Sequence, residues 1–111
     1  MGVKLVTKEI INRKARFEYH FIQMYEAGLV LTGTEVKALR QGMANLNDAY
    51  CLFDGSSLMV KSMFIAEYDH GTIYNHIARR DRRLLLHKSE LKKLERRVTE
   101  KGLTIVPYQF F

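Results

Sequence analysis

Apolar and polar residues alternate along short stretches of the chain, with the period of a half-buried β-strand. Residues 16–21 alternate three aromatic residues with Arg, Glu and His. Residues 26–28, Glu-Ala-Gly, are typical of a turn, and residues 29–32 then predict the returning strand. This part of the chain therefore predicts two short strands joined by a turn.

A hairpin is predicted in the middle of the chain. Residues 49–53 and 58–65 flank Asp-Gly-Ser-Ser, which is a strong turn signal between two strands. The alternation is lost over residues 67–81, where Gly, Asn and His collect, so this segment predicts a surface loop. Residues 103–111 predict a last strand, in which Pro107 indicates an edge position or a bulge.

Two segments have the spacing of amphipathic helices. The first starts at Thr34, a predicted N-cap, and ends near Gly42, which suits a left-handed residue at a helix end. Its apolar residues face inward, whereas Lys37 and Arg40 face outward.

The second helix is the clearer of the two. Either His87 or Ser89 serves as its N-cap, and the pair Lys101-Gly102 closes it. Its apolar stripe consists of Leu91, Leu94 and Val98.

Five short strands and two helices predict a mainly β fold. The expected architecture is an OB-like antiparallel β-barrel of Greek-key character with flanking α-helices, and an α+β sandwich is the alternative. A chain of 111 residues is sufficient for one domain, so residues 1–111 are expected to form a single unit. The chain stops in mid-strand at Tyr108-Gln-Phe-Phe111, which predicts that the domain is truncated.

Positive charge is concentrated in one region. Residues 79–101 contain ten Lys or Arg and four Asp or Glu, a net charge of +6, which equals the net charge of the whole chain. The remainder is therefore balanced, and a single basic region of this kind typically binds a polyanion. A solvated basic loop is the plainer alternative.

The sequence has neither a stretch typical of a membrane span nor the paired cysteines typical of proteins in an oxidising compartment. The longest stretch without Asp, Glu, Lys or Arg is residues 102–111, too short to cross a bilayer. Cys51 is the single cysteine, so no internal disulfide forms and it is expected to be a small core residue. A cytoplasmic protein that acts as a monomer is expected.

No enzyme signature is found. Asp69, His70 and His76 lack a regular zinc spacing, and the glycines mark turns instead of forming a phosphate-binding loop. We expect neither catalysis nor a metal or other cofactor, although a hydrolase that uses the loop histidines is kept as an alternative.

Features of nucleic-acid binding are stronger. Arg79, Arg80, Arg82 and Arg83 crowd four guanidiniums into five residues, and phosphate relieves such repulsion. Residues 12–16 form a second basic group, which a barrel could bring close to the first. Aromatic residues of the first strand could stack on bases, as in single-strand binders, but a reader of RNA shape fits better. A module that binds acidic proteins is a further alternative.

Five motifs together resemble the SsrA-binding protein family, also called small protein B, in the order of that family. They cover about residues 12–111 and are Asn12-Arg-Lys-Ala-Arg-Phe-Glu-Tyr19, Tyr25-Glu-Ala-Gly28, Gly33-Thr-Glu-Val-Lys-Ala-Leu-Arg-Gln-Gly42, Arg79-Arg-Asp-Arg-Arg-Leu-Leu-Leu-His-Lys88 and Gly102-Leu-Thr-Ile-Val-Pro107. The resemblance implies binding to the tRNA-like domain of transfer-messenger RNA (tmRNA) and rescue of stalled ribosomes by trans-translation.

The resemblance also implies particular RNA-binding positions. Glu26, Leu85 and His87 match the RNA-binding positions of the family, where many members carry Asn in place of His87. An alternative for Glu26 is a turn residue that bridges to Arg82 or Arg83. The full set of candidate RNA contacts adds the basic and polar residues Asn12, Lys14, Arg16, Lys37, Arg40, Arg79, Arg80, Arg82, Arg83 and Lys88.

The chain departs from the family pattern at its end. The resemblance implies a further strand and a long basic tail after the Val-Pro strand, and this sequence stops at Phe111. We therefore expect this chain to bind the RNA but not to support tagging on its own. Because the resemblance implies a strand that is missing here, we also expect a barrel that is open or marginally stable.

Overall fold

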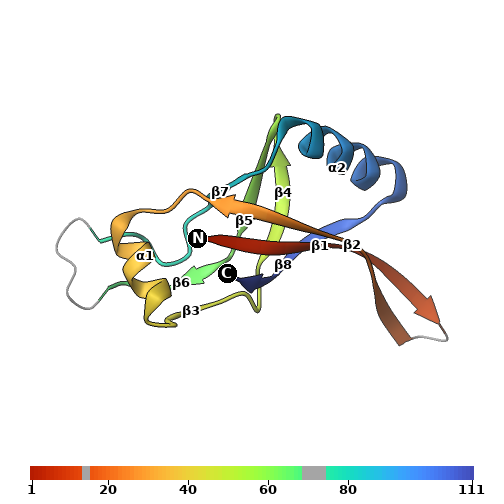
Figure 1. Ribbon diagram of the computed structural model, residues 1–111. Coiled ribbons are helices and arrows are strands. Elements are labelled where there is room, and N and C mark those ends of the chain that lie inside the picture. The colour runs from red at the N-terminus through yellow and green to blue at the C-terminus, as the bar shows by residue number, and fades with distance from the viewer. Residues whose placement is uncertain (14–15, 69–74) are drawn as a thin grey trace.

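A computed structural model of the protein describes residues 1–13, 16–68 and 75–111. Over these residues the chain forms ten elements (Figure 1), which are β1 (Gly2–Arg13), β2 (Arg16–Leu29), α1 (Gly33–Arg40), β3 (Ala44–Asn45), β4 (Tyr50–Asp54), β5 (Ser57–Lys61), β6 (Phe64–Ile65), β7 (Arg82–Leu85), α2 (Lys88–Lys101) and β8 (Thr104–Phe110). Neither helix of these ranges has the length and apolar character that crossing a membrane requires.

Six of the strands close into an antiparallel barrel in the order β1-β2-β7-β5-β4-β8, with β8 returning to β1. β2 and β7 are neighbours although the hairpin lies between them in sequence, which gives the barrel its Greek-key character. The predicted fold class, a mainly β barrel with two helices, is confirmed. The expectation of an open barrel is wrong, because β4 reaches β8 through the pair Cys51 and Ile105.

The barrel core consists of apolar side chains that point inward from every barrel strand. Its fully buried members include Val3, Leu5, Leu58, Val60 and Leu84, and Leu94 seals one end from α2. Cys51 is buried among them, as predicted, and burial raises the pKa of its thiol to about 12.

The two helices lie at opposite ends of the barrel (Figure 1). α1 begins two residues earlier than predicted, since Thr32 and not Thr34 is its N-cap. The Thr32 N–H donates to Glu35 Oε1 at 2.9 Å, and Thr32 Oγ1 accepts from the Glu35 N–H at 3.4 Å. α2 follows the prediction, with His87 as N-cap and Gly102 left-handed at φ +62°.

The start of the chain is the main departure from the predicted elements. Residues 2–13 form β1, and residues 26–28 continue β2 where a turn was predicted. Beyond the part of β1 that pairs with β8, β1 and β2 run on together as a ribbon that projects from the barrel (Figure 1). Pro107 lies at an irregularity between β1 and β8, in agreement with the predicted bulge.

Candidate nucleic-acid interface

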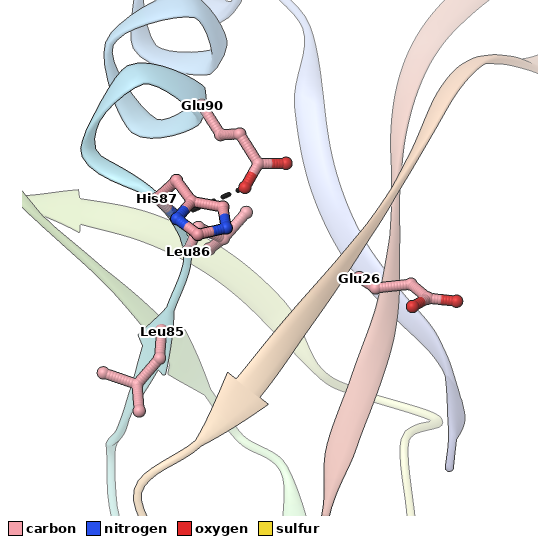
Figure 2. Close-up of a pocket in the computed structure, with 5 residues that line it drawn as sticks. All are labelled: Glu26, Leu85, Leu86, His87 and Glu90. Atoms are coloured by element: carbon pink, nitrogen blue, oxygen red, sulfur yellow. Dashed lines mark hydrogen bonds between the residues drawn. The ribbon is translucent and has the colours of Figure 1, made fainter.

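A surface pocket of about 320 Å³ lies where β7 leads into α2. Its lining residues are Glu26, Leu85, Leu86, His87 and Glu90 (Figure 2). Glu26 comes from β2, and the other four follow one another along β7, the connection and the first turn of α2. The structure thus brings together Glu26, Leu85 and His87, which are far apart in sequence.

The alternation of β7 explains why Leu85 is available at this surface. Leu84 points inward and is 2% exposed, whereas the next residue, Leu85, is 50% exposed. Leu85 pairs with Gly28 of β2, and a Cβ at Gly28 would lie 3.4 Å from the Cβ of Leu85. The missing side chain at Gly28 therefore leaves room for Leu85 to lie over the neighbouring strand.

The start of α2 fixes His87. Its backbone N–H donates to Glu90 Oε1 at 3.2 Å, so the N-cap residue is held to the first turn of the helix. The imidazole of His87 is exposed at the pocket (Figure 2).

The charges of this pocket indicate which ligand groups it can accept. Glu26 and Glu90 provide two carboxylates, and no Lys or Arg is among its lining residues in the described part of the chain. Carboxylates accept hydrogen bonds from base amino groups and 2′-hydroxyls but repel phosphate. The pocket therefore suits neutral hydrogen-bond donors of these kinds better than it suits a phosphate group.

Glu26 also lines a second, smaller pocket of about 210 Å³ with Lys4, Met24, Tyr25 and Tyr108. In the register of the two strands, Lys4 of β1 lies opposite Glu26 of β2. Sequence reasoning missed Lys4 because residues 2–13 were not assigned to a strand, although Val3 and Leu5 on either side of Lys4 show the alternation of one. The alternative ion pairs of Glu26 with Arg82 or Arg83 are not formed.

The arginine run, Arg79, Arg80, Arg82 and Arg83, contains both buried and exposed side chains. Arg82 is 0% exposed and donates to Glu35 Oε2, to the Met63 carbonyl at 2.7 Å and to the Ala78 carbonyl at 2.9 Å. The predicted phosphate contact is therefore wrong for Arg82, because its guanidinium is enclosed and its nitrogens already have acceptors in the protein.

Arg80 belongs to the same ion pair. Its Nη2 donates to Glu35 Oε1 at 2.5 Å and to the Val30 carbonyl at 3.1 Å. Burial alone would raise the pKa of Glu35, but hydrogen bonds from Arg80, the Thr32 N–H and Arg82 outweigh burial and lower it to about 2. We therefore withdraw Arg80 as well from the predicted phosphate contacts.

Arg79, Arg83 and Lys88 remain exposed. Arg79 lies over the ring of Phe64, 5.3 Å from its centroid, and donates to the Ser62 carbonyl at 3.3 Å. Arg83 and Lys88 make no ion pair with any described residue, and they flank the segment that carries Leu85 and His87.

The other predicted contacts lie away from the pocket. Lys37 and Arg40 are exposed on α1, at the opposite end of the barrel (Figure 1), and the Lys37 ammonium lies over Tyr68. Asn12 and Arg16 are strand positions at the far end of the β1–β2 ribbon, and Lys14 is outside the described residues. The expectation that the two basic groups come close together is therefore wrong for the described backbone.

His76 is a structural residue and not part of an exposed loop. It is 6% exposed, its Nε2 donates to the Ile65 carbonyl at 2.9 Å, and its Nδ1 accepts from the Thr34 hydroxyl at 2.8 Å. Asp69 and His70, the other two residues of the rejected metal set, are outside the described residues.

Residues 9–111 match the family model described as SmpB protein. The chain belongs to the SmpB protein family. It is 51% identical over 111 residues to the SsrA-binding protein of Cytophaga hutchinsonii, a match that covers 95% of this chain and 72% of that protein. It is 54% identical over 102 residues to the SsrA-binding protein of Phocaeicola vulgatus, covering 92% of this chain and 68% of that protein.

A solved structure described as "tmRNA-SmpB: a journey to the center of the bacterial ribosome" contains a similar chain. The TM-score is 0.60 at 34% identity, and the match covers 88% of this chain and 79% of the other. Across the SmpB relatives compared, this chain spans as little as 63% of the relative's length. The family resemblance inferred from the five motifs is confirmed.

Proposed function

We propose that this chain binds the tRNA-like domain of tmRNA and, as part of the SmpB system, delivers it to stalled ribosomes for trans-translation. The observation that carries the proposal is the pocket that unites Glu26, Leu85 and His87 on one surface. These are the three positions that the family resemblance implies for RNA binding. Relatives named SsrA-binding protein and the tmRNA-SmpB structure support the same ligand.

The pocket and its surroundings have different roles in this proposal. The Glu26 carboxylate accepts from a base amino group or a 2′-hydroxyl, and His87 both donates and accepts. Leu85 contributes an apolar contact, because half of its surface is exposed. Arg83 and Lys88 bind phosphates next to the pocket, because both are exposed and neither forms an ion pair with a described residue.

The cations far from the pocket are proposed to meet other RNA surfaces. A ligand seated at β7 and α2 leaves Lys37, Arg40 and Arg79 at the other end of the barrel, and ribosomal RNA is their proposed partner. Asn12, Lys14 and Arg16 remain proposed RNA contacts at the end of the ribbon. We further propose that the protein works by binding alone, without catalysis, in the cytoplasm where its ribosomal partner is found.

A gel-shift comparison tests the proposal. The wild-type chain should retain tmRNA at concentrations that leave an ordinary tRNA unbound. Glu26→Ala and His87→Ala should each weaken tmRNA binding, whereas Glu100→Ala, an exposed glutamate at the end of α2, should not. Equal retention of the two RNAs, or equal losses in all three variants, would exclude a specific role for the pocket.

A further inference from the structure

A second cleft, of about 310 Å³, lies between the β4–β5 turn and α2. Its polar lining consists of Ser56, Arg83, Lys88, Lys92 and Glu95, and two leucines, one of them Leu86, complete it. Leu86 also lines the pocket of Glu26 and His87, so the two hollows share a wall. In Figure 1 the β4–β5 turn lies beside the start of α2.

The fold directs three cations into this cleft from two elements. Arg83 points outward from β7 because its neighbours Arg82 and Leu84 point inward. Lys88, Lys92 and Glu95 are spaced by four and three residues along α2, so they share one face of the helix. Three positive charges therefore meet one negative charge there.

This arrangement does not serve the stability of the helix. Lys88 occupies the first turn of α2, where the helix dipole disfavours a cation. Lys88 and Lys92 are like charges four residues apart, which also destabilises a helix. Neither they nor Arg83 form an ion pair with a described residue. An anion bound in the cleft would relieve both unfavourable interactions and would also give Arg83 a partner.

We propose that this cleft binds an internucleotide phosphate of the RNA held in the neighbouring pocket, an inference that rests on the proposed function. The Arg83 guanidinium offers a planar fork of donors, the two lysines add point charges, and the Ser56 hydroxyl is a neutral donor. Leu86 presents an apolar surface suited to the ribose. Glu95 accepts from a 2′-hydroxyl at the edge of the cleft.

The pocket and the cleft differ in charge and would therefore bind different groups of the same RNA. The Glu26 pocket carries two carboxylates and repels phosphate, while the hollow on the other side of Leu86 carries an excess of positive charge. An RNA strand that crosses Leu86 would place a donor group in the first and a phosphate in the second. Ser56 and Lys92 thereby become RNA contacts that neither the sequence motifs nor the family resemblance indicated.

The test compares Lys92→Gln with Lys93→Gln. Both residues are exposed on α2 and both variants lose one charge, but Lys93 does not line the cleft. Binding of a transcript of the tRNA-like domain is measured over a range of salt concentrations. At about 0.15 M salt Lys92→Gln should bind about fivefold more weakly, with a log–log salt slope smaller in magnitude by about 0.9, because one phosphate contact is lost. Lys93→Gln should match the wild type in slope.

Equal effects of the two substitutions would overturn the assignment of the cleft as a phosphate site, because they would reflect the loss of net charge alone. If the wild type binds the tRNA-like domain and Lys92→Gln behaves like Lys93→Gln, the proposed function stands and the cleft fails. If the wild type binds an unrelated RNA duplex as well as it binds the tRNA-like domain, and both depend on Lys92, the cleft stands and the proposed function fails. A titration with ADP separates a mononucleotide site from a backbone site: tight ADP binding that Lys92→Gln abolishes would overturn the assignment to RNA.

Discussion

Arg82 and Glu35 form an ion pair inside the protein, and neither side chain is exposed to solvent. The pair joins β7 to the first turn of α1 across 47 residues of sequence. Burial lowers the pKa of the Arg82 guanidinium, but its ordinary value is so high that it stays protonated. The strand that carries the proposed RNA contact Leu85 is therefore anchored to α1 by a buried charge pair.

Glu35→Gln should destabilise the protein at neutral pH and much less in acid. The pKa of Glu35 falls from 4.5 to about 2 on folding, so the carboxylate contributes stability above pH 4.5 that is lost as the pH falls through 2. A shift of this size corresponds to about 3 kcal/mol. Urea unfolding at pH 7 and at pH 2.5 measures it.

The matched control for this prediction is Glu67→Gln, which removes the same charge from an exposed site. Its unfolding free energy should follow that of the wild type at both pH values. A Glu35→Gln deficit that stays constant between pH 7 and pH 2.5 would show that the carboxylate charge is not the source of the stability.

Substitutions of the adjacent residues Arg82 and Arg83 should affect different properties, stability for the first and RNA binding for the second. Arg82→Gln leaves Arg80 as the one guanidinium beside the buried Glu35 carboxylate in the described structure and removes the donor to two backbone carbonyls, so it should cost about 3–5 kcal/mol of stability. Arg83→Gln should leave the thermal transition unchanged, because Arg83 is exposed and unpaired among the described residues, and weaken RNA binding about fivefold at 0.15 M salt. Thermal melts and gel shifts on both variants check this, and a folded, weakly binding Arg82→Gln would contradict it.

The division of the arginine run shows where sequence reasoning reached its limit. Alternation over residues 82–85 would place Arg82 and Leu84 on the inner face. Buried arginines are rare, however, so four arginines within five residues indicate a charged surface. The partner that makes burial possible, Glu35, lies in a helix start that looks like an ordinary exposed first turn. Only the tertiary fold brings the two together.

The hairpin, both helices and the last strand could be predicted because each has local signals. Gly55 and Gly102 have positive φ at the predicted turn and helix end. β1 was missed because its apolar pattern alternates only at the start: Val3 and Leu5 flank Lys4, but Val6 follows Leu5 directly, and in the structure Leu5, Val6 and Thr7 are all buried. The positions Glu26, Leu85 and His87 came from the family resemblance. Glu90 in the same pocket, and Lys4 in the second pocket that Glu26 lines, could be added only once α2 and β1 had been placed.

Leu85→Ala should reduce RNA binding without loss of stability, and Leu84→Ala should do the reverse. Leu84 is enclosed in the barrel, so its truncation should cost about 2–5 kcal/mol. Leu85 is half exposed, so its truncation should cost less than about 1 kcal/mol. Denaturant unfolding and tmRNA gel shifts separate the two effects. If Leu85→Ala unfolds the protein, Leu85 belongs to the core and not to the RNA site.

Thr7→Val should stabilise the protein. Thr7 is 1% exposed, and its hydroxyl has no hydrogen-bond partner among the described residues. A buried hydroxyl without a partner costs about 1–3 kcal/mol in proteins, and valine fills nearly the same volume without a polar atom. Thr104→Val is the control, because Thr104 is exposed on β8, which pairs with β1, and its hydroxyl is free to meet water. An increase in unfolding free energy is expected for Thr7→Val alone. If Thr7→Val destabilises the protein instead, its hydroxyl is hydrogen-bonded in solution, for example to a buried water molecule inside the barrel.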